Sequence, residues 1–105
     1  MRVKAERCGD GYRCTISPAP GMYIGADGDD PLHALHGASG LAEQLARVLK
    51  EHPELKAVMP PQVDLALKAV RIAAWAARSG RLREVAHRMA PATKLVVRRI
   101  LKAVL

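Results

Sequence analysis

The sequence predicts an α+β fold, in which an N-terminal antiparallel hairpin or three-stranded meander is covered by one helix and followed by an all-helical C-terminal half. Three observations predict it. Apolar residues alternate with polar ones near the N-terminus, apolar residues recur at helical spacing from residue 31 onward, and Gly or Pro separates these segments. A chain of 105 residues has the size of one domain, so residues 1–52 and 53–105 are expected to be two parts of a single domain.

Three short segments are expected to form the sheet. The alternation at residues 2–8 and 12–17 predicts two strands joined by the turn Gly9–Gly11. A third strand is expected from Met22 to Ala26. The segment Ser17–Gly21 must turn between the second and third strands, because its two prolines cannot donate to a strand ladder.

The two cysteines lie on either side of the first turn. If this turn centres on Gly11, Cys8 and Cys14 lie opposite each other and a cross-strand disulfide is geometrically conceivable. The alternative is two reduced thiols in a cytosolic sheet. Two cysteines without a second pair or a suitable histidine spacing do not make a zinc site.

A helix over residues 31–50 is expected to cover the sheet. Asp30 is a good N-cap, and Pro31 fits the first helical position, where its missing N–H costs nothing. Gly37 and Gly40 each cost about 1 kcal/mol relative to Ala inside a helix. We therefore expect both glycines to form a groove that allows close contact with a strand or a neighbouring helix.

The C-terminal half is expected to contain a short helix at residues 53–59, a long helix at 61–79 that ends at Gly80, a short helix before Pro91, and a basic amphipathic helix at 95–105. The long helix has two apolar seams and therefore two packing partners. The seams consist of Val63, Leu67, Val70, Ala74 and Ala77, and of Leu65, Ala69, Ile72 and Ala76.

The net charge of +7 is concentrated in this half. Residues 61–105 hold ten Lys or Arg against two acidic residues, whereas residues 1–60 hold seven against eight. Such a field attracts nucleic acid, anionic lipid or an acidic protein face, and charge alone does not choose among them. The candidate nucleic-acid or partner-binding residues are Lys68, Arg71, Trp75, Arg78, Arg81, Arg83, Arg88, Lys94, Arg98, Arg99 and Lys102.

Each cationic segment also has a plainer interpretation. The face with Trp75 is more typical of a solvated helix whose Trp covers a neighbouring helix. The segment around Ser79–Arg81 has the outline of a helix-turn-helix, with Arg81, Arg83 and Arg88 on the second helix, but many helical hairpins turn at Gly. The last helix can lie on an anionic membrane, enter a partner's groove or pack within its own chain.

No catalytic constellation is visible in the sequence. The three serines lie in a Pro turn, on a small-residue helix face and at a helix end, none of which suits a nucleophile. His33 and His36 follow an acidic cluster at a spacing that suits a metal, but a third fixed ligand is missing, and Asp30 is better explained as a cap. We expect no enzymatic activity, no metal, no cofactor and no small-molecule substrate.

The opening third, with Gly9–Tyr12, Ser17–Gly21 and Gly25–Asp30 leading into a small-residue helix, resembles the HicB antitoxin half-fold over residues 2–49. In that family a further strand and a DNA-binding domain follow, whereas here Pro53 leads to helices only. Taken whole, the hairpin, the Gly/Ala-rich helix, the Pro-Pro break and the basic helical tail are similar to small proteins encoded among the virion genes of tailed bacteriophages.

The resulting expectation is a structural or assembly protein, a phage virion-type subunit that contacts neighbouring protein subunits in a homo- or hetero-oligomer and binds nucleic acid non-specifically. The alternative is a small DNA-binding regulator or HicB-like antitoxin. No apolar run reaches the length of a membrane span, and no apolar signal segment opens the chain. The expected location is therefore the cytoplasm of a bacterial host or the virion, without secretion.

Overall fold

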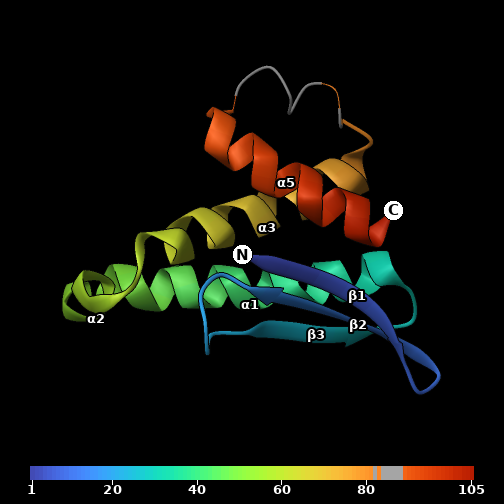
Figure 1. The fold of residues 1–105 in the computed structure, drawn as a ribbon, viewed down its shortest axis with the longest axis horizontal. Coiled ribbons are helices and arrows are strands. Elements are labelled where there is room, and N and C mark those ends of the chain that lie inside the picture. Colours follow the sequence, from blue (N-terminus) through green and yellow to red (C-terminus); the bar gives the residue numbers. More distant parts are fainter. Residues whose placement is uncertain (82, 84–88) are drawn as a thin grey trace.

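The computed structural model describes residues 1–81, 83 and 89–105, and it has the predicted α+β fold (Figure 1). A three-stranded antiparallel sheet of order β1-β2-β3 is followed by helices, as expected. The strands are β1 (Arg2–Cys8), β2 (Gly11–Ser17) and β3 (Ile24–Gly28). The helices are α1 (Pro31–Glu51), α2 (Pro53–Val58), α3 (Pro61–Ser79) and α5 (Pro91–Val104).

The third strand starts two residues later than the sequence suggested. The backbone N–H of Met22 donates to the carbonyl oxygen of Ala19 at 3.1 Å, so Met22 still belongs to the turn after β2. Gly21 has a φ of 78°, a value that glycine adopts without strain, and this lets the chain reverse before β3 begins.

The condition under which the two cysteines would lie opposite each other, a turn centred on Gly11, is not met. The first turn centres on Gly9 and Asp10, because Gly9 supplies the positive φ, 61°, that a two-residue hairpin loop requires. In the resulting register Cys8 lies opposite Gly11, and Cys14 lies opposite Ala5. Cys8 is exposed and Cys14 is buried, and both are free thiols.

Helix α1 begins as its capping residue predicts. The side chain of Asp30 accepts a hydrogen bond of 2.8 Å from the backbone N–H of His33. A Cβ at Gly37 would lie 2.9 Å from the Cβ of Ala26 on β3, so the predicted close contact is present at this glycine. At Gly40 a Cβ would meet no described atom within 4 Å, and the groove predicted there is wrong.

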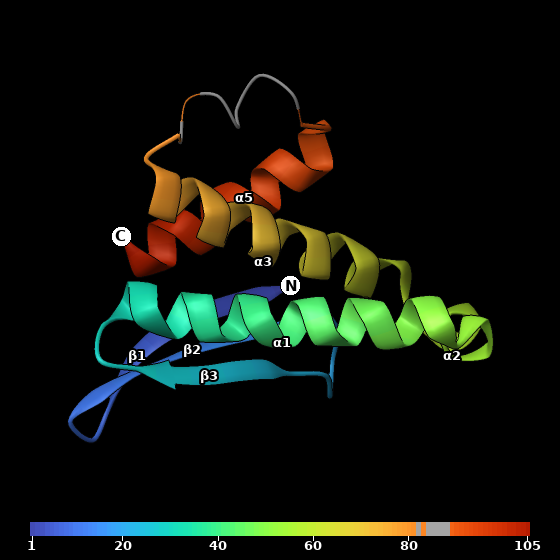
Figure 2. The same ribbon diagram turned by 180° about the vertical axis from the view of Figure 1, so that it is seen from behind.

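Helix α3 has two packing partners, as its two seams predict. It packs against α1 on one side and α5 on the other (Figure 2). Val63, Leu67 and Val70 of the first seam are buried, and the second seam contributes buried Ala69. Both partners belong to the same chain. Gly80, with a φ of 71°, ends α3 in the left-handed conformation that the sequence predicted.

Helix α5 begins at Pro91, four residues before the predicted start. Proline is tolerated in the first turn of a helix, and the N–H of Lys94 already donates to the carbonyl oxygen of Ala90 at 3.0 Å. While α1 covers β2 and β3, α5 packs against β1 and α3, which is the intramolecular alternative for this helix. The buried residues of the sheet and of α1, α3 and α5 form one core cluster.

The short helix expected between Gly80 and Pro91 rests largely on residues 82 and 84–88, which lie outside the described residues. Among the helices that the structure describes, none combines the length and the hydropathy required to cross a bilayer.

Candidate nucleic-acid interface

A cationic groove runs between the first strand and the last helix. Because α5 packs against β1, Arg99 and Lys102 lie next to Arg2 and Lys4. The groove has a volume of about 590 Å³. Its described lining residues are Met1, Arg2, Val3, Lys4, Arg99, Lys102 and Ala103, so four of seven are cationic and none is acidic. We call these four cations, Arg2, Lys4, Arg99 and Lys102, the β1–α5 cluster.

A hydrogen bond fixes one side of this groove. The guanidinium of Arg99 donates from Nη1 to the carbonyl oxygen of Met1 at 3.3 Å. The contact leaves Arg99 with further N–H donors, because a guanidinium carries five. Lys4 has one acidic neighbour, since its Nζ lies 3.3 Å from Oε2 of Glu6. Both groups of that pair are exposed, so the attraction is screened and weak.

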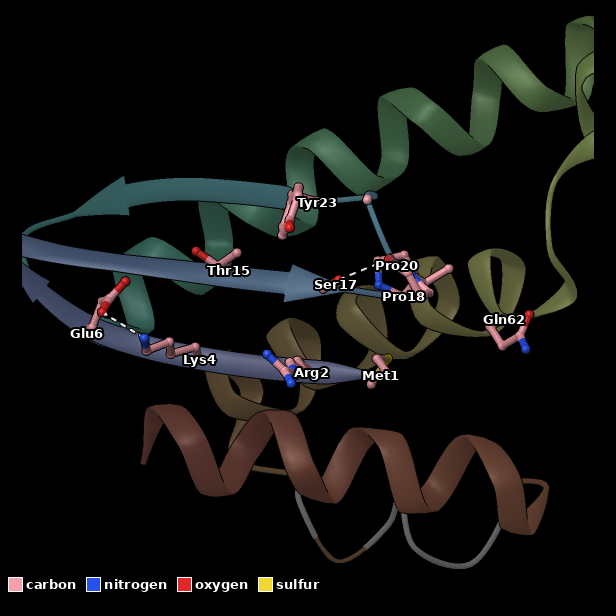
Figure 3. Close-up of a pocket in the computed structure, with 12 residues that line it drawn as sticks. Met1, Arg2, Lys4, Glu6, Thr15, Ser17, Pro18, Pro20, Tyr23 and Gln62 are labelled. Atoms are coloured by element: carbon pink, nitrogen blue, oxygen red, sulfur yellow. Dashed lines mark hydrogen bonds and ion pairs between the residues drawn. The ribbon is translucent and has the colours of Figure 1, made fainter.

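The outer face of the sheet forms a second hollow, of about 650 Å³ (Figure 3). Along β1 the side chains of Arg2, Lys4 and Glu6 are exposed, while Val3 and Ala5 are half-buried beneath them. The same alternation places Thr15 and Ser17 of β2 on the outer face, and Tyr23 stands beside them just before β3. The hollow shares Met1, Arg2 and Lys4 with the groove, so the two surfaces are continuous across β1.

An ion pair neutralises the far end of this face. Arg13 donates from Nε to Oδ1 of Asp27 at 2.8 Å and from Nη2 to Oδ2 at 3.4 Å. This hydrogen bonding lowers the pKa of the Asp27 carboxyl below its ordinary value and raises the pKa of Arg13. On this outer face Arg13 pairs with Asp27 and Lys4 pairs weakly with Glu6, whereas Arg2 belongs to neither ion pair.

The cationic face predicted on α3 is exposed. Its side chains are Lys68, Arg71, Trp75 and Arg78, and Trp75 keeps 43% of its surface accessible. The Nε of Arg71 donates to the carbonyl oxygen of Leu67 at 3.2 Å, which holds that side chain along the helix. We call these four residues the α3 stripe.

The structure separates the predicted site residues. Arg81, Arg83, Arg98, Arg99 and Lys102 are exposed, Lys94 is half-buried, and Arg88 lies outside the described residues. Helix α5 stands in front of α3 in Figure 1, and α3 stands in front of α5 in the reverse view of Figure 2. None of the described residues that line the β1–α5 groove belongs to α3, so the predicted residues do not line one common groove.

Sequence reasoning missed Arg2 and Lys4. The charge count assigned both to a nearly neutral half, although the alternation in residues 2–8 already placed them on one face of a strand. A count of charged residues carries no information on the contact between β1 and α5, which brings these cations next to those of the last helix. The helix-turn-helix interpretation has its turn at Gly80, but most of its second helix falls on residues outside the described part.

The histidines of the acidic cluster have local partners. Nδ1 of His33 accepts a hydrogen bond of 3.3 Å from the backbone N–H of Asp29 and lies 3.7 Å from that residue's carboxylate. His36 is half-buried on α1. In the described ranges, no group of three or more His, Cys, Asp or Glu side chains is placed to hold a metal ion.

Comparison with known proteins assigns the chain to no family. Protein-family models, curated proteins and solved structures give no significant match to the chain. The function has to be inferred from the charge, exposure and register of the chain's own residues.

Proposed function

We propose that the chain is a non-enzymatic structural or assembly subunit, which contacts neighbouring macromolecules, nucleic acid among them, through cationic surfaces. The β1–α5 cluster carries this proposal. It gathers cations from two segments that are far apart in the sequence, and none of the described residues that line the groove is acidic. Such a cluster attracts phosphates irrespective of base sequence, because release of condensed counterions drives the association.

The α3 stripe supports an assembly role. It lies on a different helix from the β1–α5 cluster and combines exposed cations with the accessible ring of Trp75. A subunit with two separate cationic surfaces can contact two partners. An operator-binding regulator instead concentrates its contacts on the one element that enters the DNA groove.

Exposed apolar side chains support contact with protein subunits. Leu41 and Val48 lie seven positions apart on α1, and Val58 projects from α2. Residues seven apart lie on the same face of a helix. The two seams of α3 give no such support, because α1 and α5 of the same chain pack against this helix. The exposed face of α1 and α2 therefore replaces α3 as the candidate protein contact.

Titration of a labelled DNA duplex, read by fluorescence anisotropy, tests the nucleic-acid part. We expect binding at low salt, a steep loss of affinity toward physiological salt, and the same affinity for unrelated sequences. A strong preference for one duplex would contradict the sequence-blind role and favour the regulator or antitoxin. Absence of binding at low salt would remove nucleic acid as a partner.

The phage virion and the bacterial cytoplasm stay predictions of the sequence. Mass spectrometry of purified virions tests them directly. Peptides of this chain in virions, at a stoichiometry constant between preparations, are expected of a structural subunit. Their absence from virions that contain the other gene products of the same cluster would contradict a virion role.

A further inference from the structure

The register of the sheet aligns an aromatic ring with a cation on its outer face. Arg2 lies opposite Ser17 in the β1–β2 pair. Ile16 lies opposite Ile24 in the β2–β3 pair, so Tyr23 stands beside Ser17 at the end of that pair. With neighbouring strands about 4.8 Å apart, the Cα atoms of Tyr23 and Arg2 are separated by about 10 Å. One ligand can therefore contact both side chains.

A second row lies next to the first. Thr15 of β2 lies opposite Lys4 on one side and Gly25 on the other. Gly25 carries no side chain, so the sheet surface beside the Tyr23 ring is flat. A Cβ at Gly25 would have the Thr15 Oγ1 and a backbone oxygen, both at 3.8 Å, as its nearest described neighbours. The row thus offers a flat floor, a hydroxyl and the ammonium group of Lys4, whose exposed pair with Glu6 is weak.

Tyr23 itself is the most unusual member of this surface. Its side chain keeps 72% of its area exposed, although the ring stands over the sheet (Figure 3). Within the described part of the chain no helix covers this face, because α1 packs on the opposite side of β2 and β3 (Figures 1 and 2). The ring is therefore available as a stacking platform. We call Arg2, Lys4, Thr15, Ser17 and Tyr23 the Tyr23 surface.

We propose that the Tyr23 surface binds single-stranded nucleic acid, a proposal that rests on the nucleic-acid-binding function proposed above. One base stacks on Tyr23, and the hydroxyl of Thr15 faces that base, while the hydroxyl of Ser17 donates to the carbonyl oxygen of Ala19 at 3.1 Å and holds the turn beside it. The flanking phosphates contact Arg2 and Lys4 on β1. The next phosphates contact Arg99 and Lys102 on α5, which complete the β1–α5 cluster. Aromatic platforms beside a positively charged track are the general means by which proteins hold single strands.

Charge and shape favour a single strand over a duplex at this place. A duplex offers phosphates to the β1–α5 cluster, but its bases are stacked on one another and present no free face to Tyr23. A single strand offers both. The self-neutralised pair Arg13 and Asp27 lies at the far end of the sheet, so the favourable track for phosphates runs from Tyr23 toward α5 and not along the whole face.

The test compares labelled oligothymidylate with a mixed-sequence duplex by fluorescence anisotropy, in the same buffer at the same low salt. We expect the wild-type chain to bind the single strand more tightly. Tyr23→Leu is expected to weaken single-strand binding about tenfold, since stacking one base on an aromatic side chain contributes about that much affinity or more. Tyr23→Phe is expected to retain the affinity, because it keeps the ring.

The duplex provides the matched control. Tyr23→Leu should leave duplex binding unchanged, and thermal melting should show that this exposed substitution leaves the fold intact. If a folded Tyr23→Leu chain binds oligothymidylate as wild type does, or loses both ligands equally, the Tyr23 site is wrong. If the duplex binds and the single strand has no advantage, the proposed function stands without this site. If neither ligand binds at low salt, the Tyr23 site is wrong and nucleic acid is removed as a partner, while the assembly role through protein contacts stands.

Discussion

The guanidinium of Arg99 donates a hydrogen bond to the carbonyl oxygen of Met1 across 98 positions of the sequence. This contact joins α5 to β1 and brings the cations of two distant segments into one groove. Neither segment alone has the charge density of the combined surface. The functional proposal therefore depends on packing between the two parts of the chain as much as on their composition.

The two glycines of α1 should respond oppositely to alanine. Gly40→Ala is expected to stabilise the chain by about 1 kcal/mol, because alanine is the better helix former and no described atom is close to the new methyl group. Gly37→Ala is expected to destabilise it or to gain nothing, because its Cβ would lie 2.9 Å from the Cβ of Ala26. Urea unfolding of both variants checks this. Equal stabilisation of the two would contradict the close packing of α1 on β3.

The two thiols should differ in reactivity. Cys8 is exposed, whereas Cys14 is buried, and burial raises the pKa of the Cys14 thiol. We expect one thiol per chain to react rapidly with a water-soluble disulfide reagent and the second to react only on unfolding. Mass mapping should locate the first label on Cys8. An intramolecular disulfide formed in the folded chain under mild oxidation would contradict the register of β1 and β2.

The Asp27 carboxylate should titrate at an unusually low pH. Its pKa is lowered by the hydrogen bond from Arg13, so the pair's stabilisation is present above the ordinary carboxyl pKa and is lost as pH falls through the lowered value. Arg13→Gln should return the pKa of Asp27 toward its ordinary value. A carbon-detected NMR titration of the Asp side chains measures this shift. An Asp27 pKa that is the same in both proteins would show that the pair does not persist in solution.

Local chemistry made much of the fold predictable. Asp30 followed by Pro31 marks a helix start, and Gly80 marks a helix end, because caps and left-handed residues depend on a few neighbouring atoms. The two seams of α3 likewise follow from spacing alone. The third strand was misplaced because Met22 takes part in a turn hydrogen bond, which no hydrophobic pattern reveals.

The candidate site was less predictable. Arg99 and Lys102 could be proposed from the basic helix, but their association with Arg2 and Lys4 requires the contact between α5 and β1. Tyr23 was not a candidate, because its place beside Ser17 depends on the register of β3. Long-range packing and strand register are tertiary properties, and a single sequence carries little signal for either.

The salt dependence of duplex binding, measured on a pair of charge variants, tests the central claim most directly. The double variant Arg2→Gln with Lys102→Gln removes two cations from the β1–α5 cluster. Its control, Arg7→Gln with Arg47→Gln, removes two exposed cations from the other end of β1 and from α1, for the same change in net charge. We expect the slope of log affinity against log salt to fall by about 1.8 in the first variant, about 0.9 for each lost phosphate contact, and to stay unchanged in the second. Equal slopes in the two variants would show that the β1–α5 cluster is not the phosphate-binding surface.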